Sequence, residues 1–126
     1  MAKVDPLEKK EDARGWLVEI FKEELPKGQV YLFTNKPGAV RGNHWHERKV
    51  EWFCCLLGKV KIILENRKTG GKEEIILDAE EGIQKVFIPK GVIHTVENIS
   101  KEKSWVIAYI TERFNPADPD TFYPTS

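Results

Sequence analysis

This sequence has few cysteines, few histidines and no excess of either charge. It contains two cysteines and three histidines in 126 residues, and 20 lysines and arginines balance 20 aspartates and glutamates. Cys54 and Cys55 are adjacent in an apolar segment, so on a strand their side chains point to opposite faces and cannot form an ordinary disulfide. A disulfide scaffold is therefore excluded, and we expect both thiols to be reduced and to act as small apolar side chains.

The absence of net charge also restricts the partners. No global field attracts nucleic acid or an anionic membrane, so we expect neither partner and favour a small molecule. No segment approaches the ~20 consecutive apolar residues of a membrane span, and the charged start of the chain lacks the apolar core of a signal peptide. We therefore expect a cytoplasmic protein.

Helical periodicity is missing as well. Apolar residues instead alternate in short runs between proline and glycine turn signals, at 16–22, 29–34, 40–46, 50–57, 59–65, 73–77, 85–88, 93–98 and 104–114. This pattern predicts an all-β fold of about nine strands with little or no helix, a jelly-roll barrel also described as a double-stranded antiparallel β-helix. The length predicts a single domain over residues 1–126. Residues 1–13 are expected to form an N-terminal arm, irregular or an edge strand, and residues 115–126 a tail packed on the barrel.

The three histidines and one glutamate form the main functional pattern. His44 and His46 are separated by one residue, so on a strand both imidazoles point to the same face. The odd spacing to Glu51 requires a bend near residues 47–49 that places Glu51 on the neighbouring strand. His94 follows the Pro89-Lys90-Gly91 turn signal and begins another extended run. These four residues are the predicted ligands of a metal ion.

A lone histidine is more often a surface or core residue than a ligand, so the joint spacing carries the argument. Gly38 to Gly58 reads G-x5-H-x-H-x4-E-x6-G, and Gly82 to Asn98 reads G-x6-P-x-G-x2-H-x3-N. Both spacings resemble the two motifs of the cupin superfamily. A shell of three histidines and one glutamate suits zinc, and it suits iron, manganese, nickel or copper as well.

One family within the cupins is similar over nearly the whole chain. The segments KPGAVRGNHWHERKVEWF and TERFNPADPDTF resemble the C-terminal cupin domain of capsular polysaccharide enzymes that rework UDP-linked 4-keto sugars. The upstream DARGW, with Glu19, looks like the entry segment of that domain and of nucleotide-linked 4-keto-sugar 3,5-epimerases and 3,4-ketoisomerases. The resemblance implies a bound metal, most simply zinc, and epimerisation or isomerisation beside a keto group of a nucleotide-linked sugar.

Such a reaction removes a proton from the carbon next to a carbonyl, so it needs a base near the metal. Lys49 matches a lysine of the family and is the first candidate, although a solvated lysine at a strand end is the competing interpretation. Tyr31 and Tyr109 are secondary catalytic candidates, with core aromatics as the alternative. Arg41 and Arg14 are candidate clamps for a diphosphate, against solvated arginines, and Trp45 is a candidate substrate contact.

Three functions remain open from the sequence. The first is the nucleotide-sugar epimerase or isomerase of polysaccharide precursor biosynthesis. The second is a metal-dependent cupin oxygenase, because the same ligands suit redox metals. The third is a sugar- or metabolite-binding module without catalysis. The apolar residues on both faces of the strand around Glu51, together with four tryptophans, further predict a homodimer.

Overall fold

The computed structural model describes residues 1–13, 15–21 and 27–124, and within these ranges it contains strands and no helix. The strands are β1 (Lys3–Pro6), β2 (Lys10–Asp12), β3 (Gly15–Leu17), β4 (Gln29–Asn35), β5 (Val40–His44), β6 (Glu51–Leu57), β7 (Lys59–Asn66), β8 (Lys72–Asp78), β9 (Gln84–Ile88), β10 (Val92–Asn98) and β11 (Ser104–Ile110). No helix in these ranges is therefore long and apolar enough to cross a membrane.

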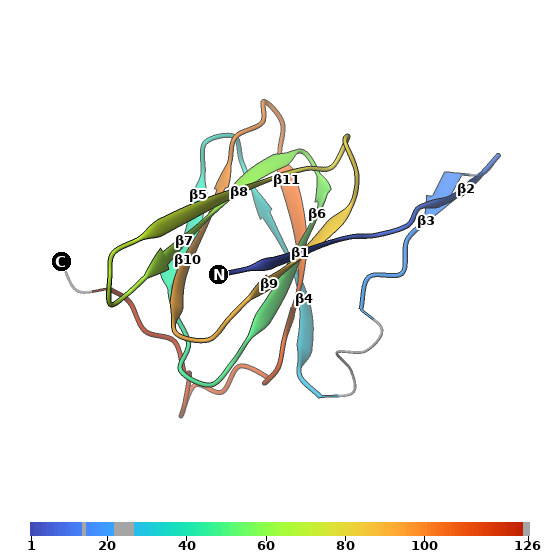
Figure 1. The fold of residues 1–126 in the computed structure, drawn as a ribbon. Coiled ribbons are helices and arrows are strands. Elements are labelled where there is room, and N and C mark those ends of the chain that lie inside the picture. Colours follow the sequence, from blue (N-terminus) through green and yellow to red (C-terminus); the bar gives the residue numbers. More distant parts are fainter. Residues whose placement is uncertain (14, 22–26, 125–126) are drawn as a thin grey trace.

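Two antiparallel sheets face each other and form the barrel (Figure 1). One has five strands in the order β1-β9-β6-β11-β4, and the other has four in the order β5-β10-β7-β8. The expected jelly-roll fold is confirmed, and the two sheets together contain nine strands, of which eight correspond to predicted ones. β2 and β3 pair only with each other in a short hairpin that extends away from the barrel (Figure 1).

The N-terminal part of the chain departs from the expected strand pattern. The run at 16–22 was expected to form one strand of the barrel, but only Gly15–Leu17 is a strand, and residues 22–26 lie outside the described part. The ninth barrel strand is instead β1, which pairs with β9 as an edge strand. An edge strand receives hydrogen bonds from one side only, so a short polar segment can supply it without a strong apolar pattern.

The core lies between the two sheets and is built from the inward-facing residues of alternating strands. Its buried members include Phe53, Cys55, Val60, Ile62, Leu64, Leu77, Val86, Ile88, Val96, Val106 and Ala108. Cys54 and Cys55 are free and buried, with Cys55 in this core and Cys54 on the opposite face of β6. This confirms that they form no disulfide with each other.

The outer face of the five-stranded sheet is also apolar. Tyr109 pairs with Trp52 of β6 and Val30 of β4 in the sheet register, so these three side chains share that outer face. Phe21 covers part of it by packing against Tyr109, with ring centroids 5.7 Å apart. The uncovered part leaves Val30, Leu32 and Trp105 exposed by 48%, 53% and 42%.

Candidate metal centre

A bulge at the end of β5 aims His44 into the barrel. The pairing of β5 with β10 shifts between His94 and Thr95, which leaves Asn43 as an extra residue between Gly42 and His44. Gly42 and Asn43 have positive φ angles of 93° and 58°. A Cβ at Gly42 would lie 2.7 Å from the carbonyl oxygen of His94, so only glycine fits this crossing. The bulge therefore sets His44 directly opposite His94.

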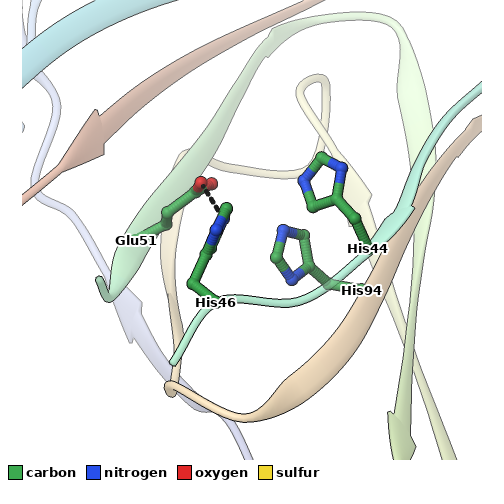
Figure 2. A group of neighbouring side chains, drawn as sticks. All are labelled: His44, His46, Glu51 and His94. Atoms are coloured by element: carbon green, nitrogen blue, oxygen red, sulfur yellow. Dashed lines mark hydrogen bonds and ion pairs between the residues drawn. The ribbon is translucent and has the colours of Figure 1, made fainter. Parts of the chain in front are cut away.

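The chain then crosses from one sheet to the other. Trp45 forms an isolated antiparallel bridge with Phe122, the chain bends at residues 47–48, and β6 begins at Glu51 in the five-stranded sheet. The bend was expected, but Glu51 enters the opposite sheet rather than a neighbouring strand of the same one. Glu51 consequently approaches the histidines from across the barrel (Figure 2).

The four predicted ligands come together in one cluster. One ligand atom from each of His44, His46, Glu51 and His94 lies within 4.8 Å of all the others (Figure 2). The ring centroids of the three histidines are 4.7 to 5.3 Å apart. His46, Glu51 and His94 are buried, and His44 is half-buried. The spacing argument thus identified residues that the fold places around a single point.

Hydrogen bonds orient the rings of His46 and His94. His46 Nδ1 donates to the carbonyl oxygen of Asp120 at 2.7 Å, and its Nε2 lies 2.9 Å from Glu51 Oε1. The Tyr31 hydroxyl donates to the other oxygen of Glu51 at 3.1 Å. His94 Nδ1 lies 3.2 Å from the carbonyl oxygen of Val92, which can only accept, so this nitrogen carries the proton.

The environment of the cluster lowers the pKa of two of the histidines and raises the pKa of the third. Burial, together with the neighbouring His94 and His46, lowers the pKa of His44 to about 4, and burial also lowers the pKa of His94. Burial opposes the charged form of His46 too, but the hydrogen bonds to Glu51 and Asp120 outweigh it and raise its pKa. Burial would likewise raise the pKa of Glu51, yet the bond from His46 holds that pKa low. His44 and His94 are therefore neutral at pH 7, as metal ligands must be.

One atom tests whether the cluster fits a metal. His94 Nε2 is buried and has no hydrogen-bond partner among the described residues, and its lone pair points into the cluster. A buried polar atom without a partner is costly, and a bound cation would satisfy it. Three imidazole nitrogens and one carboxylate form a donor set typical of zinc and of the other first-row divalent metals. The residues therefore fit the implied ion.

Two cavities border the cluster. The larger, of about 500 Å³, is lined by Tyr31, Phe33, Arg41, Gly42, His44, Phe53, His94, Val96 and Tyr123. The smaller, of about 260 Å³, is lined by Gln29, Tyr31, His44, His46, Lys49, Glu51, Ile110, Glu112, Phe114 and Thr121. Tyr31 and His44 belong to both linings. The larger volume lies within the ~300–1,000 Å³ typical of small-molecule sites.

The structure brings some of the other candidates to this site. Lys49 is buried and lines the smaller cavity beside Glu51, and Tyr31 contacts Glu51 directly. Arg41 lines the larger cavity, where its Nε donates to Asn35 Oδ1 at 2.7 Å and its Nη2 donates to the carbonyl oxygen of Thr34 at 3.0 Å. These bonds fix the guanidinium at the cavity wall.

Other candidates lie elsewhere. Tyr109 faces the outer side of the five-stranded sheet, away from Glu51, so the structure does not place it at the cluster. Trp45 is stacked between Phe122, at 4.7 Å between ring centroids, and the Arg67 guanidinium, 3.5 Å from its ring centroid. It lines neither cavity, and its role as a substrate contact stays a prediction. Arg14 lies outside the described residues.

The sequence argument missed two residues of the tail. Asp120 holds His46 through its carbonyl, and Tyr123 places its ring edge-on to His44 with centroids 5.8 Å apart. Tyr123 therefore lines the larger cavity, and Asp120 supports His46 from behind the cluster. Asp120 belongs to the distal segment that resembles the capsular enzymes, but neither spacing nor periodicity connects it to His46.

The barrel topology and the cluster of three histidines and one glutamate define this protein as a cupin whose central site could hold a metal. More specifically, the chain belongs to the polysaccharide biosynthesis C-terminal domain family, whose model matches residues 10–122.

Named relatives of the chain work on sugars. It is 32% identical over 111 residues to the UDP-2-acetamido-2,6-beta-L-arabino-hexul-4-ose reductase of Pseudomonas aeruginosa, covering 88% of this chain and 29% of the reductase. It is 29% identical over 119 residues to the probable low-salt glycan biosynthesis epimerase Agl13 of Haloferax volcanii, covering 86% of this chain and 76% of Agl13.

A solved structure agrees with this assignment. The capsular polysaccharide assembling protein CapF from Staphylococcus aureus superimposes with a TM-score of 0.76 and 32% identity, covering 96% of this chain and 35% of CapF. The chain spans about a third of the length of CapF and of the reductase.

Proposed function

We propose that this cupin is an epimerase or isomerase that acts next to the keto group of a nucleotide-linked 4-keto sugar in polysaccharide precursor biosynthesis. The observation that carries the proposal is the cluster of His44, His46, Glu51 and His94 between two cavities, with Lys49 buried at its side. The names of the reductase and epimerase relatives support the substrate class and the reaction class.

The four cluster residues would hold a divalent ion, most simply zinc, which when bound supplies a positive charge that stabilises a developing enolate. The chain itself must move the proton. Burial and the neighbouring Glu51 carboxylate raise the pKa of Tyr31, so its hydroxyl stays protonated and is not suited to be the base. Lys49 is then the better candidate for the base, and Tyr31 orients Glu51 through its hydrogen bond.

Arg41 is the proposed anchor for the diphosphate. Its inner edge is already bound to Asn35 and Thr34, so its remaining N–H groups are oriented before the substrate arrives. A pre-oriented guanidinium binds a phosphate with little loss of side-chain entropy. We place the sugar in the larger cavity, against His44 and Phe53, with the diphosphate at its rim.

Solvent deuterium tests the proposal. A UDP- or dTDP-linked 4-keto sugar incubated with the zinc-loaded protein in D2O is expected to gain deuterium beside its carbonyl. The Lys49→Met variant should slow this exchange by about 100-fold or more, the usual contribution of a general base. Lys59→Met is the matched control, because Lys59 lines a cavity formed by Pro6, Ile76 and Asp78 instead. Tight binding of these sugars without any exchange would favour a binding module, and oxygen consumption by iron-loaded protein would favour an oxygenase.

We also propose that the protein is a homodimer formed through the outer face of the five-stranded sheet. Val30 and Leu32, on the edge strand β4, and Trp105, on the neighbouring strand β11, are exposed apolar residues on that face. Apolar surface of this kind on a sheet face is typical of an association site. Light scattering on the purified protein tests the expected mass of two chains.

A further inference from the structure

Asp120 is hydrogen-bonded through both its side chain and its backbone carbonyl. Asp120 is only 2% exposed, and its carboxylate accepts three backbone N–H groups, from Glu47 at 3.0 Å, Arg48 at 3.1 Å and Lys49 at 3.0 Å. Its own carbonyl oxygen accepts the proton of His46 Nδ1 at 2.7 Å. A single tail residue therefore contacts four successive residues of the segment that links β5 to β6.

The backbone of Asp120 is fixed in an uncommon conformation. Its φ is +47°, in the left-handed region that residues other than glycine seldom adopt, although aspartate and asparagine are enriched there. The next residue but one, Phe122, exchanges two backbone hydrogen bonds of 2.9 Å with Trp45. The tail is thus held on both sides of the site, at Asp120 and at Phe122.

The two contacts of Asp120 act on two different groups of the site. A carbonyl at Nδ1 keeps the proton on that nitrogen, so the lone pair of Nε2 is directed toward the cluster when an ion is held. The carboxylate closes residues 47–49 into a turn around itself, and the backbone of Lys49 is one of its three donors. That turn directs the Lys49 side chain into the smaller cavity.

We propose that Asp120 is a positioning residue that sets the ring orientation and protonated nitrogen of His46 and the entry of Lys49 into the site. Only the part that concerns Lys49 rests on the proposed function. Partners of metal-ligating histidines change metal affinity by about 10–100-fold when they are removed. The carbonyl of residue 120 persists in every variant, so the role of the carboxylate is to keep that carbonyl in place.

Two variants and one control separate positioning from general stability. Asp120→Gly tolerates the positive φ but removes the three carboxylate contacts. Asp120→Asn keeps one oxygen acceptor and is the conservative variant. Asp118→Asn is the control, because Asp118 lies two residues away on the same tail and pairs only at the surface with Arg48.

The readouts are the slowly exchanging Nδ1 proton of His46, observed by 15N-edited NMR of the metal-free protein, and the zinc affinity from competition with a chelating dye. In Asp120→Gly we expect the proton signal to be lost and zinc affinity to fall about 10–100-fold. Asp120→Asn should show a smaller fall, and Asp118→Asn should match the wild type. Thermal unfolding of the metal-free proteins shows whether each variant folds.

The proposal is overturned if folded Asp120→Gly keeps both the His46 signal and the wild-type zinc affinity, or if Asp118→Asn changes them equally. If Asp120→Gly does not fold, Asp120→Asn decides: changes beyond those of Asp118→Asn support the proposal, and their absence overturns it. If no 4-keto sugar exchanges deuterium with the wild type, the proposed function fails, while the NMR and zinc results still decide the role of Asp120.

Discussion

Zinc should reverse the order of stability of the wild type and the His94→Leu variant. In the metal-free protein, His94 Nε2 is buried without a partner, which costs about 1–3 kcal/mol. His94→Leu removes that cost and loses the bond from Nδ1 to Val92, worth about 1 kcal/mol. The side chains have similar volumes, so we expect the metal-free variant to equal or exceed the wild type in free energy of unfolding.

Zinc should make the wild type more stable than His94→Leu. A ligand that binds only the folded state stabilises a protein by about 2.7 kcal/mol when the free ligand is at 100 times Kd. For a chain of this size, that corresponds to an increase of about 10 °C in Tm. The variant loses one of four ligands and should gain far less. The net result is a wild type that is less stable than His94→Leu with chelator and more stable with zinc.

Differential scanning calorimetry with EDTA and with a buffered zinc excess measures both differences. Glu97→Gln is the matched control, because Glu97 lies on the same strand but pairs with Lys61 outside the cluster. It should respond to zinc as the wild type does. Identical wild-type melting curves with EDTA and zinc would refute the metal site, and a metal-free His94→Leu that is destabilised by more than about 3 kcal/mol would refute the reasoning on the unpartnered nitrogen.

Three further predictions follow from the same structure. Burial opposes the charge of Asp120, but the amides of Lys49, Arg48 and Glu47 outweigh it and hold the pKa low. Its carboxylate should therefore stabilise the fold above about pH 4 and lose this effect as the pH falls further. The difference in free energy of unfolding between the wild type and Asp120→Asn should consequently become smaller only below about pH 4. Burial raises the pKa of Cys54 to about 12 and of Cys55 to about 11, so a thiol reagent at pH 8 should label them only at the rate of unfolding; fast labelling of native protein would contradict this. Leu32→Glu should shift the light-scattering mass toward one chain, and an unchanged mass would remove the outer face from the proposed dimer.

The parts of the site that local spacing determines could be predicted from the sequence. Alternation along an extended chain places His44 and His46 together, and the glycine and proline signals locate the turns before them and before His94. Alternation also predicts that Trp45, between these two histidines, points away from them. The sequence alone does not give the register of β11 against β6, and that register is what places Tyr109 beside Trp52 on the outer face.

Contacts between distant segments could not be predicted. Asp120 meets His46 only because the tail returns across the barrel, 74 residues further along the chain. An edge strand was one of the two alternatives expected for residues 1–13, but its pairing with β9 could not be predicted, because an edge strand makes hydrogen bonds that any short segment can make. The bulge at Asn43 was also not predicted, although the neighbouring glycine is the residue type that such a bend requires.

The ligands of the cluster belong to two different layers of the barrel. His44 and His94 lie on the four-stranded sheet, and Glu51 lies on the five-stranded one. An ion bound by all three would join the layers, so its full release would require the sheets to move apart or one side chain to withdraw. Isotopic exchange of bound zinc should consequently be slow. Its rate should be set by transient opening of the barrel and should not depend on the concentration of free zinc.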